Sequence, residues 1–242
     1  MMRGLLVALG FLTRLPVPPR AFDDAQARTA SLAWYPLVGA ILGLLLWGLA
    51  ALLHGTPPLL SAALLLLGWV ALTGALHLDG LADSADAWIG GLGDRERTLA
   101  IMKDPRCGPA GVVALVVLLL LKFAALASLP PAHGAALLLA PLLARMALTG
   151  AFLWLPYVRS GGLGSALAGA SRSACLTSVA LGAAACLPFG WRGLLALLLA
   201  AIVFALWRRA CLCRLGGFTG DTAGALAEMI EAAVLVGLAL AG

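Results

Sequence analysis

The sequence has little charge. Only 11% of its 242 residues are Asp, Glu, Lys or Arg, whereas 62% are hydrophobic and the mean hydropathy is +1.03. Soluble domains typically carry about 25% charged residues, so the composition excludes an ordinary soluble globular protein. Apolar runs of about 20 residues, the length that crosses a hydrocarbon core of about 30 Å, recur from end to end. We expect one polytopic membrane domain over residues 1–242.

Paired cysteines and dense basic blocks are also missing. The five cysteines show no CxxC spacing, and several lie within apolar runs, where Cys behaves as a small hydrophobic residue. We therefore expect neither a disulfide framework nor a zinc site. The formal net charge is +5, but no basic stripe interleaved with aromatics indicates nucleic-acid binding. Membrane topology accounts better for the basic residues.

Apolar runs and helix breakers predict seven membrane-spanning helices, within a range of six to eight. The fifth and sixth are short, and one hairpin that dips partway into the bilayer is the alternative for them. Residues 1–20 lack the small-residue cleavage site of a signal peptide, so we expect an interfacial or re-entrant helix there. The predicted fold is an all-α helical membrane bundle, with a short cytoplasmic helix near 94–103. The predicted spans are 34–53, 58–78, 108–128, 134–155, 174–190, 193–207 and 222–241.

The basic residues are distributed unevenly between the connections of these helices. With the N-terminus in the cytoplasm, most fall in cytoplasmic connections, whereas "HGTPP" and "LPPAHG" on the other side contain no Lys or Arg and "FGWRG" contains only Arg192. This asymmetry follows the positive-inside rule. All 11 acidic residues fall on the same cytoplasmic side or in the first turns of the last span. Both signs of charge thus meet at one membrane face, and seven spans place the C-terminus at the other.

Three aspartates stand close together in "HLDGLADSADAWIGG", residues 77–91, directly after the second apolar run. In a helix, positions i, i+4 and i+7 share one face, so Asp79, Asp83 and Asp86 are expected on the same side. Such carboxylates repel one another unless a cation lies among them, and hard oxygen ligands suit Mg²⁺ or Mn²⁺. We interpret them as metal ligands rather than as a solvated helix end. On a continuous helix His77 points about 160° away from Asp79, which indicates an interfacial histidine outside the site.

Charged and glycine-rich segments follow at two other places. After a short amphipathic helix with Asp94 as its N-cap, "KDPRCGPAG" supplies two cations and another aspartate, and cations of this kind hold phosphate oxygens. "RLGGFTGDTAGALAEMIEAA" places a second glycine-rich turn with an aspartate just before the last span. The candidate residues in these two segments are Lys103, Asp104, Arg106, Thr219, Gly220 and Asp221.

Some ionisable residues lie within the predicted spans. Glu228 follows Asp221 by seven residues on the same helical face, and carboxylates inside a span are functional candidates because they are costly to bury there. Arg145, in the middle of its span, is the natural opposite charge. A substrate role for Glu228 and Arg145 and a buried structural ion pair are both compatible with the sequence. Lys122 lies nearer the outer end of its span, where it is interpreted as snorkelling to the interface.

The motifs together resemble one known family. In order and along nearly the whole chain, "FLTRLPVP", "WYPLVG", "HLDGLADSADA", "MKDPRCGPAG", "ARMALTGAFLWLPYVRSGGLG" and "GGFTGDTAGALAE" resemble the cobalamin synthases, the adenosylcobinamide-GDP ribazoletransferases. The likeness to the CDP-alcohol phosphotransferases is looser. Asp83 stands after "DGLA" where their signature has Arg, and the continuation to two further aspartates is absent.

The resemblance implies a transferase of the last cobalamin assembly stage, in the plasma (inner) membrane of a prokaryote with its active site on the cytoplasmic side. Such an enzyme joins adenosylcobinamide-GDP to α-ribazole or its 5'-phosphate, releases GMP and requires Mg²⁺. The ribazole 3'-hydroxyl attacks the phosphorus on the cobinamide side, so the protein mainly positions reactants and neutralises charge. A homo-oligomer or a complex with other cobalamin-assembly enzymes is compatible with this reading.

The candidate residues receive roles under this hypothesis. The metal ligands are Asp79, Asp83 and Asp86. The catalytic set adds Asp104 and Asp221, one of which completes the metal shell. Asp86 or Asp221 takes the hydroxyl proton, because a carboxylate next to its like has a raised pKa. The substrate-binding residues are Lys103, Arg106, Arg145, Thr219, Gly220 and Glu228.

Two alternatives remain at this point. One is a CDP-alcohol-type phosphotransferase of phospholipid synthesis. The other is a cation- or proton-coupled transporter, which should carry charges at the midplane of several spans and show repeated halves. The chain instead keeps its acids near one interface and shows no internal repeat.

Overall fold

The fold is built of helices. The computed structural model describes residues 2–129, 134–159 and 163–241, and no strand occurs in those ranges. The predicted all-α membrane fold is confirmed. The α-helices are α1 (Met2–Leu12), α2 (Ala25–Ala30), α3 (Tyr35–Leu52), α4 (Pro58–Thr73), α5 (Leu76–Gly90), α6 (Arg95–Ile101), α7 (Pro109–Ser128), α8 (Gly134–Trp154), α9 (Arg172–Ala184), α10 (Gly190–Leu215) and α11 (Gly220–Leu240), and the 3-10 helices are η1 (Pro19–Phe22), η2 (Ser31–Trp34), η3 (Leu163–Leu167) and η4 (Leu187–Phe189).

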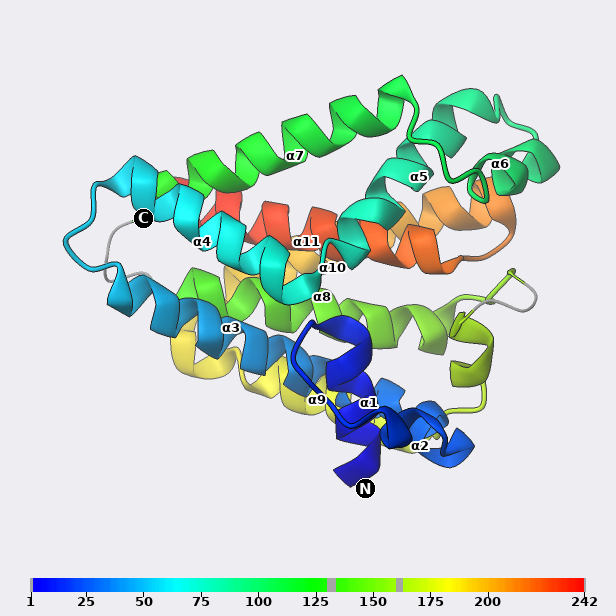
Figure 1. Ribbon diagram of the computed structural model, residues 1–242, viewed down its shortest axis with the longest axis horizontal. Helices are drawn as coiled ribbons and strands as arrows, with labels where there is room; N and C mark the ends of the chain where they lie inside the picture. Colours follow the sequence, from blue (N-terminus) through cyan, green and yellow to red (C-terminus); the bar gives the residue numbers. More distant parts are fainter. Residues whose placement is uncertain (1, 130–133, 160–162, 242) are drawn as a thin grey trace.

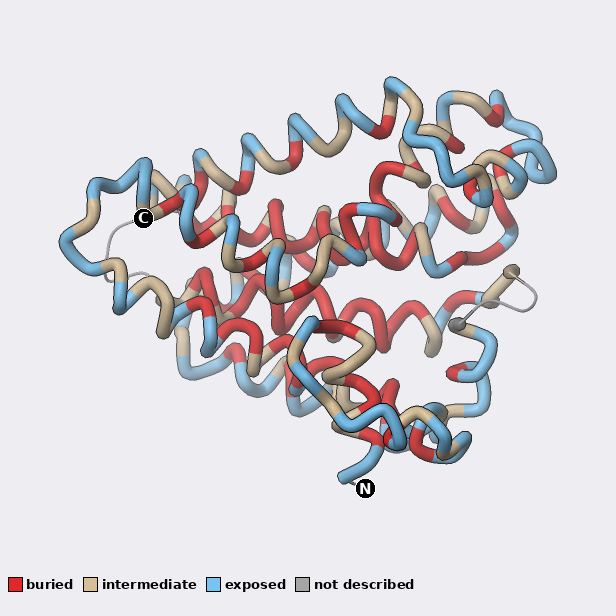
Figure 2. The backbone as a smooth tube through the Cα atoms, viewed as in Figure 1, coloured by how far each residue is buried: buried red, intermediate tan, exposed pale blue. Residues whose placement is uncertain are grey.

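The helices α8 and α11 form the centre of the bundle, as the continuous red stretches in Figure 2 show. About three quarters of α8 (78%) and two thirds of α11 (67%) are buried, against 28% of α7. The outer helices therefore turn most of their apolar surface outward, as lipid-facing helices do. Contact between α3 and α8 uses small residues, as helix packing in lipid requires: a Cβ on Gly39 would lie 2.4 Å from the carbonyl oxygen of Pro141.

The number of helices that can cross a membrane is smaller than the seven predicted, and it reaches the lower end of the predicted range only if a bent pair counts as one span. Five described helical stretches are long and apolar enough, or six if α4 and α5 together form one broken span. The predicted spans 174–190 and 193–207 fall within one apolar stretch, 172–215. Within it α9 has 13 residues and is only about 20 Å long, short of a hydrocarbon core of about 30 Å.

The second predicted span is broken by a sharp turn. The helices α4 and α5 meet at 89°, because Gly74 and Ala75 both have left-handed backbones with φ of 62° and 58°. The N-terminal segment secures the turn, since the amide of Arg14 donates to the carbonyl of Leu72 at 2.7 Å. Glycine is favoured at position 74 by its positive φ, and a Cβ there would also lie 2.0 Å from Nε of Arg14, whose side chain would have to move. The expectation that a helix runs straight from the second span into the aspartates is wrong.

Charged segments gather at one end of the bundle. Figure 1 shows α6, the α8–α9 connection and the α10–α11 connection at that end, and the C-terminus with the α3–α4 connection at the opposite end. The predicted short helix is confirmed as α6, with Asp94 capping it by accepting from the amides of Glu96 and Arg97. The N-terminal α1 has 11 residues and packs on α2, η2 and α3.

Candidate active site

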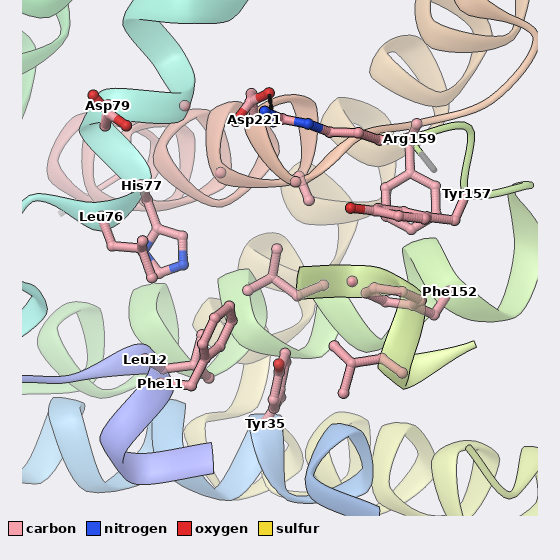
Figure 3. A pocket seen from close by; sticks show the side chains of 18 of the residues that line it. Phe11, Leu12, Tyr35, Leu76, His77, Asp79, Phe152, Tyr157, Arg159 and Asp221 are labelled. Atoms are coloured by element: carbon pink, nitrogen blue, oxygen red, sulfur yellow. Dashed lines mark hydrogen bonds and ion pairs between the residues drawn. The ribbon is translucent and has the colours of Figure 1, made fainter. Parts of the chain in front are cut away.

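A cavity of about 530 Å³ lies at the charged end, between the beginnings of α5 and α11. Figure 3 shows its acidic and basic side chains on one side and its aromatic rings on the other. Its lining therefore combines a polar wall and an apolar wall. The polar wall consists of His77, Asp79, Lys103, Tyr157, Arg159 and Asp221, and the apolar wall includes Phe11, Leu12, Tyr35, Phe152, Leu167 and Phe218.

Two glycines let α5 and α11 approach closely enough to form the polar wall. A Cβ on Gly80 would lie 2.7 Å from the carbonyl oxygen of Asp221, and a Cβ on Gly224 would lie 3.2 Å from that of His77. Any larger residue at Gly80 must push the two helices apart, because the opposing atoms belong to the backbone. The "HLDG" and "TGDTAG" motifs are thus in direct contact, which brings Asp79 and Asp221 to the same cavity.

The carboxylates of Asp79 and Asp83 are free of direct partners. No hydrogen bond or ion pair reaches either of them from the described residues, and Asp79 is exposed to the cavity. Asp83 lies one turn further along α5, where Asp79, Asp221 and Asp86 repel its charge and Arg159 attracts it. Uncompensated carboxylates at this spacing favour a bound cation or a proton.

Asp86, unlike Asp79 and Asp83, is hydrogen-bonded to backbone amides at the start of α7. Its two oxygens accept from the amides of Gly108 at 2.6 Å and Gly111 at 2.9 Å, so it binds the N-terminal end of α7. A Cβ on either glycine would come within 2.5 Å of the Asp86 carboxylate. Its carboxylate is therefore occupied by backbone donors, where a negative charge is also favoured by the helix dipole.

Arg159 is a site residue that the sequence analysis did not single out, since it counted only as one of the basic residues of the cytoplasmic connections. Its Nη1 donates to Oδ2 of Asp221 at 2.8 Å, and both side chains line the cavity. An isolated bridge holds the segment before it, since the amide of Val158 donates to the carbonyl of Phe218 at 2.9 Å. In the sequence, the only indication of this role is an isolated Arg beside the glycines of "YVRSGGLG". The segment before Arg159 meets the "GGFTGD" motif only in the folded structure.

The "KDPR" segment contributes one residue to the cavity. Lys103 lines it and has no ion-pair partner within the described chain. Asp104 and Arg106 instead pair with each other, through Nε at 2.9 Å and Nη2 at 2.7 Å. Arg106 thereby lowers the pKa of Asp104 to about 2. Neither residue lines the cavity, so the structure does not bring these two candidates to the other site residues.

Thr219 and Gly220 form the start of α11. The Thr219 hydroxyl accepts from the amide of Thr222, and the Thr222 hydroxyl accepts from the amide of Thr219, a reciprocal capping box. Gly220 lines the cavity, whereas the buried Thr219 does not. Thr219 therefore positions Asp221 by fixing the first turn of its helix.

The charged residues within the spans form a buried network of ion pairs. Lys122 of α7 donates to Glu228 and Glu231 of α11, and Arg145 of α8 donates to Glu231. All four side chains are at most 5% exposed, and their charges balance. None of them lines the cavity. The interpretation of Lys122 as snorkelling is wrong, because its ammonium is held inside the bundle. Arg145 and Glu228 both belong to buried ion pairs, but with different partners, Glu231 and Lys122 respectively.

His77 lies at the point where this network meets the cavity. It is 4% exposed, lines the cavity, and its Nδ1 lies 3.4 Å from Nη2 of Arg145. The interpretation of His77 as an interfacial residue is therefore wrong. The turn between α4 and α5, which the sequence pattern did not indicate, aims the start of α5 into the bundle.

The aromatic side of the cavity is a packed cluster. Phe218 contacts Phe152 and Tyr157 edge-on, with ring centroids at 4.9 and 5.3 Å, and Phe152 stacks on Tyr157 at 5.8 Å. Burial raises the pKa of Tyr157, so its hydroxyl stays a donor at neutral pH. This surface suits the flat apolar part of a ligand whose charged part lies against Asp79, Lys103 and Arg159.

The predicted metal ligands do not form a ready-made cage. In the part of the chain that the structure describes, no three His, Cys, Asp or Glu side chains are arranged to hold an ion by themselves. The free carboxylates of Asp79 and Asp83, with Asp221 nearby, nevertheless have the donor chemistry for Mg²⁺, which usually takes one or two carboxylates together with substrate phosphates.

Comparison with known proteins is unambiguous over the whole chain. The family model described as cobalamin-5-phosphate synthase matches residues 4–239. The adenosylcobinamide-GDP ribazoletransferase of Stutzerimonas stutzeri (strain A1501) is 61% identical over 99% of this chain and 98% of its own length. The protein of that name from Pseudomonas paraeruginosa (strain PA7) is 60% identical over the same shares, and that from Pseudomonas fluorescens (strain Pf0-1) is 56% identical over 99% of this chain and 100% of its own. No solved structure matches significantly.

Proposed function

Because the chain belongs to the cobalamin-5-phosphate synthase family, we propose that it acts as an adenosylcobinamide-GDP ribazoletransferase on the cavity between α5 and α11. The hydroxyl oxygen of α-ribazole, or of its 5'-phosphate, forms a new bond to the phosphorus on the cobinamide side of the diphosphate. The bond between that phosphorus and the bridging oxygen breaks, and GMP leaves with the bridging oxygen. The hydroxyl proton passes to a base or to water.

The observation that carries this proposal is the cavity where "HLDG" and "TGD" meet. The carboxylate of Asp79, which has no partner among the described residues, lines the same cavity as two cations, Lys103 and Arg159, and several aromatic rings. Asp83 does not line the cavity and lies one turn further along α5. A diphosphate needs cations for its oxygens, and an attacking hydroxyl needs an acceptor for its proton. Apolar walls suit the flat base of the nucleoside. The one cavity offers all of these groups.

The carboxylates fit a bound Mg²⁺. No donor or cation among the described residues is bound to Asp79 or Asp83, so they are the residues that would hold the ion, with Asp221 beside them. When bound, Mg²⁺ supplies positive charge that offsets the charge on the diphosphate. Asp86 is used by the amides of α7 and therefore fixes the position of α5 against α7 instead.

The remaining residues orient the reactants. Lys103 is exposed and lines the cavity, and no carboxylate of the described ranges pairs with it, so it binds a phosphate oxygen without first breaking an ion pair. Arg159 holds the carboxylate of Asp221 at 2.8 Å and presents its other N–H groups to the ligand. Asp79 accepts the proton of the attacking hydroxyl, because it is the exposed carboxylate of the cavity.

The site faces the cytoplasm of the prokaryotic cell under this proposal, and the protein lies in the inner membrane. The support is the charge asymmetry, since the basic connections lie at the cavity end of the bundle (Figure 1). Both substrates are polar, water-soluble molecules, so an opening at the cytoplasmic face gives them access. Association with a second copy or with other enzymes of cobalamin assembly belongs to the same proposal.

A reconstituted assay tests the proposed reaction. Purified protein in liposomes is given adenosylcobinamide-GDP, α-ribazole and Mg²⁺, and GMP is measured over time. The proposal expects GMP in amounts equal to the joined product. GMP with neither α-ribazole nor its 5'-phosphate, together with CMP from a CDP-alcohol, would instead identify a phosphotransferase of phospholipid synthesis.

A further inference from the structure

His77 joins two parts of the molecule that otherwise have separate roles. On one side its Nδ1 lies 3.4 Å from Nη2 of Arg145, inside the buried ion-pair network. On the other side its ring forms part of the cavity wall, between Asp79 above it and Phe11 and Leu12 below it in Figure 3. Which nitrogen of this ring carries the proton therefore decides whether His77 presents a hydrogen-bond donor or an acceptor to a ligand in the cavity.

The contact with Arg145 determines that arrangement. A guanidinium has five N–H donors and no acceptor, so in this hydrogen bond Nδ1 must be the acceptor. A neutral imidazole that accepts at one nitrogen carries its proton on the other. Arg145 stays charged in proteins, and Glu231 holds it in place by accepting from Nη1. The proton of His77 accordingly lies on Nε2.

The Nε2 atom is available to a ligand. Among the described residues, the buried side-chain nitrogen and oxygen atoms without a partner are Nε1 of Trp69, Oγ of Ser84 and Nε of Arg145. Nε2 of His77 is not one of them, although its only hydrogen-bond contact within those residues is made by Nδ1. It therefore keeps accessible surface, and the surface that this buried residue reaches is the cavity.

We infer that His77 donates a hydrogen bond from Nε2 to an oxygen of a bound substrate, and that Arg145 is the positioning residue that keeps the proton on that nitrogen. The inference rests on the proposed function, because the acceptor oxygen belongs to one of its two substrates, a phosphate oxygen of adenosylcobinamide-GDP or an oxygen of the ribazole nucleoside. An imidazole with its proton on Nε2 and its lone pair on Nδ1 engaged by Arg145 has no free lone pair for a metal. His77 thus acts on the substrate and not as a ligand of Mg²⁺.

The first test reads the tautomer directly and does not depend on turnover. The protein is labelled with ¹⁵N-histidine and studied by long-range ¹H–¹⁵N correlation, with the His77 signals assigned by their loss in His77→Gln. The chain has 3 histidines, so the spectrum is simple. The inference expects the neutral ring with its proton on Nε2. A proton on Nδ1, or a ring protonated at both nitrogens at neutral pH, would overturn it.

The second test distinguishes the roles of the two ring nitrogens by replacing His77 with Gln or Asn. Gln places an amide near the position of Nε2 and keeps a donor toward the cavity, whereas Asn reaches only as far as Nδ1. We expect KM for one substrate to rise about tenfold to a hundredfold in His77→Asn, the loss expected for a hydrogen bond to a charged or strongly polar oxygen. In His77→Gln it should rise by about threefold or less, with kcat changed little in both. Measuring KM for each substrate in turn identifies which one supplies the oxygen.

The same rise in KM for both variants, or no rise in His77→Asn, would show that the side chain only fills space. The role of Arg145 is tested in the paired variant Arg145→Met with Glu231→Gln, which removes one charge of each sign. A folded protein should show a mixture of His77 tautomers and the KM of His77→Asn, and an unchanged tautomer would refute the positioning role. If the wild-type protein releases no GMP, the proposed function fails, while the tautomer measurement still tests the ring itself.

Discussion

The close contact of α5 and α11 can be disrupted by one methyl group. In Gly80→Ala the new Cβ would lie 2.7 Å from the carbonyl oxygen of Asp221 and 3.0 Å from its Cα. Ordinary van der Waals contact begins at 3.4 Å, so the helices must move apart by about 0.7 Å. Neither opposing atom belongs to a flexible side chain. The movement therefore passes directly to the distance between Asp79 and Asp221.

The expected loss of stability is small and the expected loss of activity is large. Overpacking in a filled interior costs about 1 to 3 kcal/mol, and the better helix propensity of Ala offsets about 1 kcal/mol of this. The free energy of unfolding should therefore fall by about 2 kcal/mol at most. Displacing catalytic groups by about 1 Å lowers turnover by about a hundredfold, so we expect GMP release to slow between tenfold and a hundredfold.

The assay is the initial rate of GMP release in liposomes, alongside thermal unfolding of the same preparation. The matched control is Gly48→Ala in α3, where an added Cβ meets no atom within 4 Å, and it should keep the wild-type rate. A folded Gly80→Ala protein with wild-type turnover would refute the reasoning that this contact sets the geometry of the site.

Three further changes test other parts of the account. Asp83→Asn should abolish divalent-dependent GMP release because it removes a free carboxylate beside Asp79, and retained activity with an unchanged metal dependence would contradict the metal role. Lys103→Glu should raise KM for the nucleotide substrate by at least tenfold while kcat at saturation changes less, since an unpaired cation in the cavity binds phosphate; the reverse pattern in steady-state kinetics would argue against this. Lys122→Met should lower the free energy of unfolding by about 3 to 5 kcal/mol, the cost of leaving a buried charge unpaired. The double variant Lys122→Met with Glu228→Gln should regain part of the lost free energy of unfolding, as measured by thermal unfolding. If Lys122→Met alone is as stable as the wild type, the ion-pair network contributes little to stability.

The sequence predicted half of the polar wall, namely the residues at which charge interrupts an apolar run: Asp79, Lys103 and Asp221. Asp79 and Asp221 are conspicuous because each stands at the edge of a span, and Lys103 because it follows a capped helix that returns to the membrane. The contact between "HLDG" and "TGD" was expected from the chemistry of the carboxylates. The glycines that make it possible, Gly80 and Gly224, are explained only by the crossing of two helices that are distant in the sequence.

The residues whose roles were not predicted depend on tertiary contacts, which the spacing of apolar residues along the chain does not reveal. The turn at Gly74 and Ala75 includes a non-glycine residue with positive φ, which the local sequence does not predict. This turn places His77 in the cavity wall instead of at the membrane interface. Lys122 lies in a strongly apolar run, and only the position of α11 beside α7 reveals its two glutamate partners. Arg159 stands in a loop, and its role follows from the bridge that pairs its neighbour with Phe218.

The central claim is that the free carboxylate of Asp79, in the cavity between α5 and α11, serves the transfer of the diphosphate. The most direct measurement is GMP release from adenosylcobinamide-GDP and α-ribazole by wild-type and Asp79→Asn proteins, reconstituted side by side in liposomes with Mg²⁺ and matched for thermal unfolding. The account predicts GMP from the wild type and a loss of at least a hundredfold, the scale of general acid–base catalysis, in the variant. A folded Asp79→Asn protein that releases GMP at the wild-type rate would contradict it.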